Sequence, residues 1–373
     1  MRIRSTAIAA AGLGLALTLA ACGQNTAAPS APASSAAAAP EGATKVGVIL
    51  PETESSARWE GFDKPLLTAA MQAEGLQADI QNAQGDEQKF STLADGMISS
   101  GVKVLVIASI TSEAGAAVAA KAQAQGIKVI DYDRLNLGGT SEYYVSFDNT
   151  KVGELQGQGL VQGLGAKQGA QIIEIAGAPT DNNATLFYNG AQQVLEPKYA
   201  SGEYKRVAKQ AIEDWDNQIG GTTFEQLLTA NGGQVDGVLA ANDGLAGAII
   251  TVLTKYGLNG KVIVTGQDAT PDGLQAILRG DQYMTVYKEI KQEADATAKL
   301  AAALAKGDTA AADALATATE KDPTGNRDVK SVLLEPQLIT KENVKTVIEG
   351  GQVKAEEVCV AALARACGQL GIQ

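Results

Sequence analysis

Short apolar segments of β type, separated by longer Ala-rich segments, constrain the fold of this chain more than any other feature. Val and Ile recur in KVGVIL (45–50), VKVLVIA (102–108), IKVIDY (127–132), AQIIEIA (170–176), VDGVLAA (235–241) and KVIVTG (261–266). Strands that are apolar on both faces belong to parallel sheets that helices cover on both sides. We therefore expect an α/β fold with doubly wound sheets.

The chain is long enough for two such sheets. Of its 373 residues, the segment 23–44 is rich in Ala, Pro and Ser, and it predicts a flexible tether because it cannot bury enough apolar surface to fold. About 330 residues remain, which is more than one hydrophobic core usually holds. Two lobes are therefore expected.

The two halves of the folded part repeat each other loosely. GVKVLVIASITSEAG followed by GIKVIDYDR in the first half is echoed by QVDGVLAANDGLAG followed by GKVIVTGQDA in the second. Each half is then a βαβ unit that ends in an aspartate, Asp133 in the first and Asp268 in the second. Ligands of open parallel sheets bind outside the carboxyl ends of the strands. Two such edges facing each other across a cleft would place both aspartates on one small molecule.

Polar and aromatic side chains gather at these strand ends. They are Arg58, Trp59, Asp133, Arg134, Asn182, Asn183, Trp215, Asn242, Asp243, Asp268 and Lys288. Carboxylates, amides and guanidinium groups pair with the hydroxyl groups of a sugar, and indole rings pack on the apolar faces of a pyranose. Each residue taken alone also has a structural interpretation, as a helix cap, an ion-pair partner or a core side chain. Their common position favours a sugar site.

Composition excludes several classes of function. The chain has 30 basic and 42 acidic residues and a net charge of -12, which argues against nucleic acid as a partner. It has no histidine, which rules out Ser-His-Asp and Cys-His nucleophiles and every His-ligated metal site. We therefore expect no metal and no cofactor, and an enzyme would lack much of the usual set of catalytic groups.

The first 22 residues predict export. Arg2 and Arg4 precede an apolar stretch that is too short and too quickly terminated to span a membrane, as in a signal peptide over 1–22. The segment ends in LAAC, which resembles a bacterial lipobox. We expect lipid on Cys22 to anchor the protein at the outer face of the cell membrane, or in the periplasm. An ordinary secretory signal, in which Cys22 is incidental, is the alternative.

Besides Cys22, the chain contains only Cys359 and Cys367. In an exported chain this pair predicts a disulfide that closes a small C-terminal loop. Two free thiols are the alternative, although nothing else in the sequence indicates redox chemistry.

Seven stretches in order carry a resemblance to a known family. They are ARW (57–59), YDR (132–134), FDNTKVGELQ (147–156), PTDNNATLF (179–187), ANDGLAG (241–247), GQDA (266–269) and MTVYK (284–288). From Lys45 to about Lys345 the chain resembles the periplasmic D-xylose-binding proteins of sugar ABC importers, a branch of the ribose-binding-like family. The lipobox, the tether and the C-terminal cysteines depart from that pattern.

The resemblance implies the periplasmic binding protein type I fold, with two Rossmann-like lobes and a hinge of three crossings. The N-terminal lobe would comprise 45–147 and 289–320, and the C-terminal lobe 148–288 and 321–373. One monosaccharide, above all the aldopentose D-xylose, would bind between the lobes to the strand-end residues and pass to a membrane permease. The resemblance does not decide between Asn182 and Asn183. It implies no catalysis, and we expect a monomer.

Other functions stay open at this point. Asp133 and Asp268 are the pair of carboxylates that a sugar-acting enzyme on this fold would use, but Arg134 beside Asp133 should keep that carboxylate ionised. A site for another aldose (glucose, galactose or ribose) that feeds a chemosensory receptor is also compatible with these residue types. A sugar-responsive transcription regulator is not, because residues 1–43 leave no room for a DNA-binding headpiece.

Overall fold

The fold is described for residues 44–53, 56 and 58–372 of a computed structural model. The predicted signal peptide, Cys22 and the tether up to residue 43 lie outside these residues. The described residues all belong to one compact unit. Within it, none of the helices is long and apolar enough to cross a membrane.

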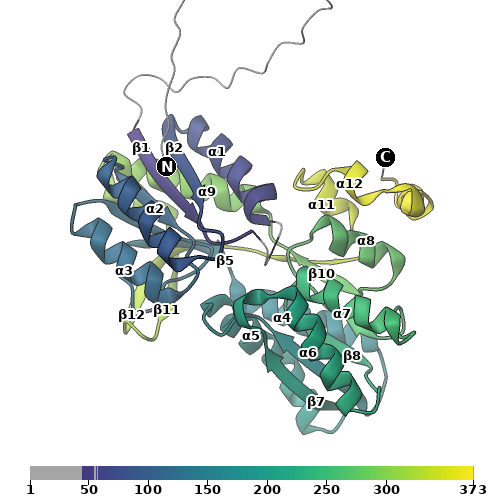
Figure 1. The fold of residues 1–373 in the computed structure, drawn as a ribbon. Coiled ribbons are helices and arrows are strands. Elements are labelled where there is room, and N and C mark those ends of the chain that lie inside the picture. The colour runs from purple at the N-terminus through teal and green to yellow at the C-terminus, as the bar shows by residue number, and fades with distance from the viewer. Residues whose placement is uncertain (1–43, 54–55, 57, 373) are drawn as a thin grey trace, which may run out of the picture. The chain divides into compact units, whose positions relative to one another are not determined.

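The first sheet has the strand order β11-β12-β5-β4-β3-β1-β2 and is parallel except at β11 (Figure 1). Its strands are β1 (Thr44–Leu50), β2 (Leu76–Asn82), β3 (Val104–Ile107), β4 (Lys128–Tyr132), β5 (Tyr143–Phe147), β11 (Ala318–Asp322) and β12 (Arg327–Leu334). Its helices are η1 (Trp59–Asp63), α1 (Lys64–Ala73), α2 (Glu87–Ser99), α3 (Ser112–Gln123), α9 (Ile290–Ala305) and α10 (Thr309–Leu315). We call this sheet and its helices the first lobe.

Alternation along β1 explains how helices cover this sheet on both faces. Val48 and Leu50 pack in one apolar cluster with α1 and α9. Ile49, one position away, packs in another cluster with Phe90 of α2 and Val118 of α3. Successive side chains of a strand point to opposite faces, so both faces of β1 need apolar side chains. This is the reason for the continuous Val and Ile runs in the sequence.

The second sheet is parallel, with the order β7-β6-β8-β9. Its strands are β6 (Ala170–Ala176), β7 (Tyr204–Ala211), β8 (Gly237–Ala240) and β9 (Ile263–Val264). Its helices are α4 (Asn149–Leu164), α5 (Asn182–Ala200), η2 (Glu213–Trp215), α6 (Asn217–Ala230), α7 (Asp243–Lys255) and α8 (Pro271–Arg279). Ile173 packs with Phe224 of α6 on one face, and Ile172 packs with Leu160 of α4 on the other. This sheet and its helices form the second lobe.

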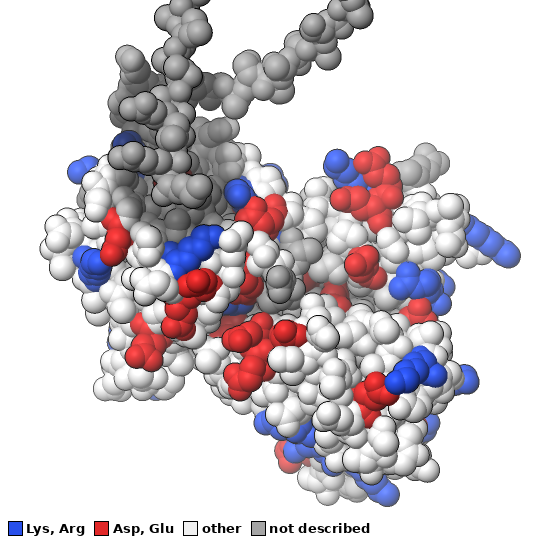
Figure 2. Space-filling model, viewed as in Figure 1, with Lys and Arg blue, Asp and Glu red and all other residues white. Residues whose placement is uncertain are grey.

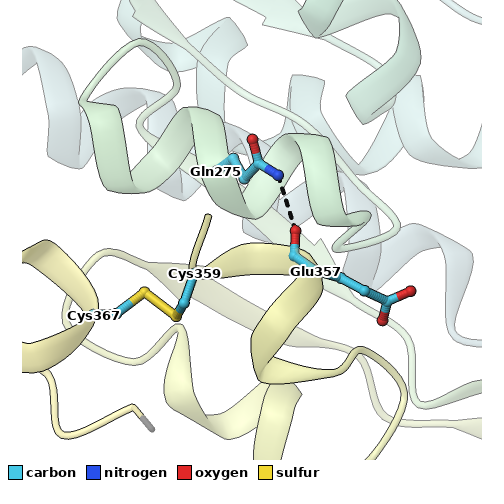
Figure 3. Close-up of a disulfide and its surroundings, with 4 residues drawn as sticks. All are labelled: Gln275, Glu357, Cys359 and Cys367. Carbon is cyan, nitrogen blue, oxygen red and sulfur yellow. Dashed lines mark hydrogen bonds between the residues drawn. A yellow bond between two sulfur atoms is a disulfide. The ribbon is translucent and has the colours of Figure 1, made fainter. Parts of the chain in front are cut away.

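A small antiparallel pair and a C-terminal segment complete the second lobe. The pair consists of β10 (Met284–Tyr287) and β13 (Gln337–Thr340). The C-terminal segment contains α11 (Lys345–Glu349), α12 (Ala355–Val358), η3 (Ala361–Leu363) and α13 (Ala364–Gln369). It packs in one apolar cluster with Leu274 and Ile277 of α8. Figure 3 shows the disulfide between Cys359 and Cys367 in this segment, and the hydrogen bond of 2.9 Å from Gln275 Nε2 of α8 to the Glu357 carbonyl.

The doubly wound α/β fold expected from the sequence is confirmed, and the six apolar segments correspond to β1, β3, β4, β6, β8 and β9. The edge strands β2 (LQADIQN) and β7 (YKRVAKQA) did not stand out in the sequence. An edge strand has a neighbour on one side only, and much of each of these two strands is exposed. Their polar composition therefore lacks the continuous apolar run on which the prediction relied.

One predicted lobe boundary is wrong. We placed residues 321–373 in the second lobe, but β12 pairs with β5 in the first sheet, in register from Lys330 with Tyr143 to Leu334 with Phe147. The chain therefore returns to the second lobe after Leu334, where β13 pairs with β10. The other two passages between the lobes follow Phe147 and Tyr287. The misplaced strand lies beyond the quoted repeats, so no sequence pattern indicated its partner.

Candidate functional site

A polar pocket lies at the carboxyl ends of the strands of both sheets. Among the residues that the structure describes, its lining comprises Ser56, Arg58, Trp59, Asp133, Arg134, Asp181, Asn183, Phe187, Trp215, Asn242, Gln267, Asp268 and Lys288. The lining includes every predicted ligand residue except Asn182 and Asp243. Parallel strands present their carboxyl ends at one edge, and this edge is where such sheets bind ligands.

The two aspartates that close the sequence repeats have matching backbones. Asp133 has φ 61° and Asp268 has φ 99°, in the region that residues other than glycine seldom adopt. The Asp133 N–H donates to Val145 O at 2.8 Å, and the Asp268 N–H donates to Val286 O at 2.9 Å. Each aspartate is therefore turned out of its strand end and tied to the next strand. Unusual backbone of this kind is concentrated at functional sites.

Arg58 is the cation that holds Asp133 charged. Arg58 Nη1 lies 2.6 Å from Asp133 Oδ2, while Nε and Nη2 bind Asp63 at 2.9 and 2.7 Å, and Nη2 also reaches Glu293 at 3.0 Å. Burial alone raises the pKa of Asp133, but Arg58, then Lys288 and Arg134, outweigh it and lower that pKa to about 2. Arg134 does contribute to the lowered pKa, as expected, but Arg58 is the nearer and stronger partner.

Arg134 instead joins the two lobes. Its Nη2 lies 2.6 Å from Glu52 Oε1 in the first lobe, and its Nε lies 3.2 Å from Asp181 Oδ2, at the start of α5 in the second lobe. The guanidinium groups of Arg58 and Arg134 lie 4.5 and 5.3 Å from the centre of the Trp59 ring. Trp59 is thus buried against two cations. The face of an indole ring attracts cations, so these contacts stabilise the position of the ring.

Lys288 connects the two equivalent aspartates. Its Nζ lies 3.2 Å from Asp268 Oδ1 and 3.8 Å from Asp133 Oδ2, and its side chain is only 3% exposed. A buried ammonium group needs such partners, because burial without them costs several kcal/mol. The predicted strand-end lysine therefore faces the pocket rather than solvent.

An apolar wall faces these charged groups. Trp215 and Phe187 meet edge to face, with ring centres 6.4 Å apart. The Trp215 indole N–H donates to Asp181 Oδ2 at 3.2 Å, and a side chain at Gly177 would come within 2.1 Å of the ring. Trp215 has φ 58°, so a local turn directs this ring into the pocket.

Three buried polar atoms of the lining make no hydrogen bond within the described part of the chain. They are Trp59 Nε1, Gln267 Oε1 and Asp268 Oδ1, of which the last lies near Lys288 Nζ. Buried donors and acceptors are almost always bonded, so Trp59 Nε1 and Gln267 Oε1 call for a partner from outside the protein, whereas Asp268 Oδ1 already has Lys288 as an ion-pair partner. One free donor and one free acceptor suit a ligand with hydroxyl groups, which donate and accept.

The structure decides between the two adjacent asparagines. Asn183 lines the pocket, where its Nδ2 donates to the Asp133 carbonyl at 2.9 Å and its Oδ1 accepts from Asn149 Nδ2 at 2.9 Å. Asn182 is half-buried and does not line the pocket. Asn183 thereby links the second lobe to the backbone of Asp133.

Asp243 does not face the pocket. Its carboxylate accepts from Gln282 Nε2 at 2.8 Å, Thr285 Oγ1 at 2.9 Å and the Thr270 N–H at 2.9 Å. Burial raises its pKa to about 7, although these hydrogen bonds act in the opposite direction. Asp243 therefore fastens the start of α8 to β10, while its neighbour Asn242 caps α7 and lines the pocket.

Four lining residues were absent from the predicted set: Ser56, Asp181, Phe187 and Gln267. Sequence signals existed for three of them. Asp181 and Gln267 lie beside predicted residues at strand ends, and Phe187 follows Asn183 by one helical turn on α5. Ser56 shows no such signal, and its Oγ donates to Asp268 Oδ2 at 3.2 Å across the lobes.

The chemistry of the lining is suited to binding. Asp133 is held ionised by its cations, so this carboxylate is not placed to act as a general acid. In the described residues, no group of His, Cys, Asp and Glu is placed to hold a metal ion. What the pocket offers is a set of fixed charges and amides beside aromatic rings, which is the chemistry of carbohydrate recognition.

Comparison with known proteins agrees with this geometry. Residues 46–309 match the family described as "Periplasmic binding protein domain". The chain is 37% identical over 315 residues to the D-xylose-binding periplasmic protein of Escherichia coli, covering 84% of this chain and 92% of that protein. It is 36% identical over 308 residues to the protein of the same name from Haemophilus influenzae, covering 82% and 90%.

A solved structure is similar over the same region. It is an ABC transporter solute-binding protein of Clostridium phytofermentans with bound β-D-glucose, 31% identical, with a TM-score of 0.77 over 84% of this chain and all of that one (100%). Fold, pocket and sequence thus lead to the same conclusion. The chain belongs to the periplasmic binding protein family and has its type I fold.

Proposed function

We propose that this protein is an exported solute-binding protein that captures one monosaccharide, above all D-xylose, and delivers it to the permease of an ABC importer. Two relatives are named for D-xylose, and the similar solved structure holds β-D-glucose. These sugars differ by one hydroxymethyl group, so the pocket chemistry described above suits both. We propose an aldose in pyranose form as the ligand class.

The observation that carries the proposal is the set of unpartnered atoms in the pocket. Trp59 Nε1 and Gln267 Oε1 are buried without a hydrogen bond in the described part of the chain, and both belong to the lining. Leaving such groups unbonded costs about 1 to 3 kcal/mol each. Sugar hydroxyl groups would satisfy both, while the rings of Trp59 and Trp215 pack on the C–H faces of the sugar.

Binding requires the lobes to open and close. The pocket encloses only about 30 Å³, room for a few water molecules at most, so a pentose does not fit beside the present contacts. Contacts between the lobes close it, including Asn183 Nδ2 to the Asp133 carbonyl and Arg134 Nε to Asp181. A sugar that touches both lobes favours their closed arrangement.

The hinge in this proposal lies at the three passages of chain. The Asp148 N–H donates to the Leu334 carbonyl at 2.9 Å, which ties two of these passages together. We take the first lobe as 44–147 with 289–334 and the second as 148–288 with 335–372. X-ray scattering with and without xylose tests this: the radius of gyration should be smaller with xylose bound, and an unchanged profile at saturation would contradict a moving hinge.

We further propose that the mature protein is a monomer, anchored through lipid on Cys22. The support is the LAAC sequence after a short apolar stretch and the polar tether that follows. Wild-type protein should partition with membranes, whereas Cys22→Ala should be released or left unprocessed. A wild-type protein that is wholly soluble, with an unmodified N-terminus, would contradict the anchor.

Calorimetry over a panel of aldoses tests the ligand class. We expect xylose or a close aldose to bind, and Gln267→Leu to weaken binding at least tenfold because its side chain can no longer accept a hydroxyl group. Gln125→Leu, at an exposed position outside the pocket, is the matched control and should bind as wild type. Prolonged incubation should return a labelled pentose unchanged. Failure of every aldose to bind, or conversion of the sugar, would contradict the proposal.

A further inference from the structure

A second cavity, which we call the outer pocket, adjoins the sugar pocket. It encloses about 400 Å³, against about 30 Å³ for the sugar pocket. Arg134, Asp181 and Trp215 line both cavities, so the two are neighbours that share one boundary. The outer pocket is the larger space by a wide margin.

The outer pocket is built from strand ends, as the sugar pocket is. In the first lobe it uses Glu52 after β1, Gln84 after β2 and Ile110 after β3. In the second lobe it uses Thr180 after β6, and Gln218 beyond β7. The sugar pocket draws on Asn242 after β8, Gln267 after β9 and Lys288 after β10 instead. The two cavities thus form a row along the edge at which parallel sheets bind ligands.

The lining of the outer pocket repeats the chemistry of a sugar site. Side-chain amides and a threonine hydroxyl offer paired donors and acceptors, and Trp215 contributes to the boundary. The described lining also contains four carboxylates, Glu52, Asp181, Asp214 and Asp216, against one guanidinium, Arg134. This excess of negative charge disfavours an anionic group. Figure 2 shows acidic side chains gathered over the region of α5 on the visible face.

We propose that the outer pocket is a second subsite, which holds the remainder of a neutral glycoside whose terminal sugar occupies the sugar pocket. The ligand range then extends from monosaccharides to neutral disaccharides. This inference rests on the proposed function, because the terminal sugar must bind first. The link between the two rings passes Arg134 and Asp181, whose contact of 3.2 Å is the longer of Arg134's two ion pairs. If the ion pair between Arg134 and Asp181 breaks, Arg134 can retain its ion pair with Glu52, which has a distance of 2.6 Å in the structure.

Calorimetry with matched pairs of sugars tests the subsite. The pairs are xylose with xylobiose, and glucose with cellobiose. For the pair whose monosaccharide binds, the wild-type affinity for the disaccharide should lie within 30-fold of the affinity for the monosaccharide. A glucuronide of the same sugar should bind at least tenfold more weakly than the neutral disaccharide, because its carboxylate meets the acidic lining.

A bulky substitution localises the effect. Thr180→Trp, at an exposed position of the outer pocket, should weaken the disaccharide at least tenfold and leave the monosaccharide within twofold. Thr251→Trp, at an exposed position on α7 outside both pockets, should change neither. A disaccharide that binds more than 30-fold more weakly than its monosaccharide, or equal losses for both sugars in Thr180→Trp, would overturn the subsite. Absence of monosaccharide binding would instead overturn the proposed function.

Discussion

Asp133 and Asp268 occupy equivalent places in the two lobes, but their surroundings differ. Each aspartate follows a strand and has a positive φ, and each donates its N–H to a carbonyl of the next strand that it meets. Asp133 Oδ2 lies 2.6 Å from the guanidinium of Arg58. Asp268 instead accepts from the Ser56 hydroxyl at 3.2 Å, and its Oδ1 makes no hydrogen bond within the described part of the chain, although Lys288 Nζ is 3.2 Å away.

The comparison separates what the repeat provides from what it does not. The repeated βαβ unit places a carboxylate at the same point of each sheet edge. The two cations that act most strongly on Asp133 come from outside the quoted repeats, Arg58 from the segment before η1 and Lys288 from the residue after β10. Asp133 is therefore engaged by the protein itself, whereas Asp268 keeps an acceptor for a ligand. The first two predictions below test this difference directly, and the later ones concern the elements that surround the second aspartate.

Removal of Arg58 should have the largest effect. Arg58→Met leaves Asp63, Asp133 and Glu293 buried without their shared cation. Breaking a buried ion pair by removing one partner costs about 3 to 5 kcal/mol, and urea unfolding should show a loss of stability in that range. Arg279→Met is the control, because its pair with Asp281 is exposed and should contribute less than about 1 kcal/mol. Similar losses in Arg58→Met and Arg279→Met would show that the buried ion pairs of Arg58, including that with Asp133, contribute no more than an exposed pair.

Asparagine at the two equivalent positions should affect sugar binding in different ways. Asp268→Asn changes an acceptor that remains for the ligand, so it should alter the ranking of xylose, ribose and glucose. Asp133→Asn deprives Arg58 of a charged partner, so it should weaken every aldose and also lower the melting temperature. Calorimetry should show losses of about 1 to 3 kcal/mol in either case. If both variants bind all three sugars like wild type, the sugar pocket is wrongly placed.

The strand-end residues could be predicted because their position depends on local pattern. A strand of continuous Val and Ile must end where polar residues begin, and the edge of a parallel sheet gathers those ends. This reasoning reached Asp133, Asn242 and Asp268, which lie within four residues of their strands. The sugar class followed from the residue types gathered there.

The partners of those residues could not be predicted, because they depend on tertiary packing. Glu293 lies on α9, far along the chain from Arg58, and only the packing of α9 on the first sheet brings the two within 3.0 Å. Asp243 follows Asn242 directly, yet the helix start turns its carboxylate toward Gln282. Residue type alone does not reveal which of two adjacent polar side chains faces a cleft.

The buried Asp243 should make stability fall as pH rises. Burial raises its pKa in the folded protein to about 7, above the ordinary value of about 3.9, so the folded state holds a proton that the unfolded state has released. This stabilisation is complete below about pH 4 and is lost as pH rises through about 7. Asp133 affects the pH dependence of stability in the opposite direction. Its pKa is lowered to about 2, so its contribution to stability is lost only as pH falls below about 4.

Urea unfolding at pH 5, 6, 7 and 8 checks this sign. Asp243 should contribute at most about 1.4 kcal/mol per pH unit, and the Asp243→Asn variant should lack that part of the slope. Asp131, whose pKa burial raises to about 6, keeps its own contribution in both proteins. Parallel stability curves for wild type and Asp243→Asn would show that the carboxylate is ionised throughout this range.

Loss of the C-terminal disulfide should have the smallest effect. The bond between Cys359 and Cys367 closes a loop with a sequence separation of 8, in a segment that packs on α8 outside both sheets. A short loop constrains the unfolded chain less than a long one, so Cys359→Ser with Cys367→Ser should lose at most about 2.6 kcal/mol. Intact mass under non-reducing conditions should first show that wild type lacks the two thiol hydrogens.

Sugar affinity in the same double variant tests how far the site depends on this segment. Asp268 lies just before α8, and Ala269 belongs to the same apolar cluster as Leu363 and Cys367. The Ala269 N–H is held by Thr285 Oγ1 at 3.2 Å, and the Asp268 N–H is held by Val286 O, both on β10. These bonds do not involve the C-terminal segment, so calorimetry should give an unchanged affinity. A tenfold loss of affinity would show that the second aspartate, unlike the first, is positioned from the C-terminal segment through α8.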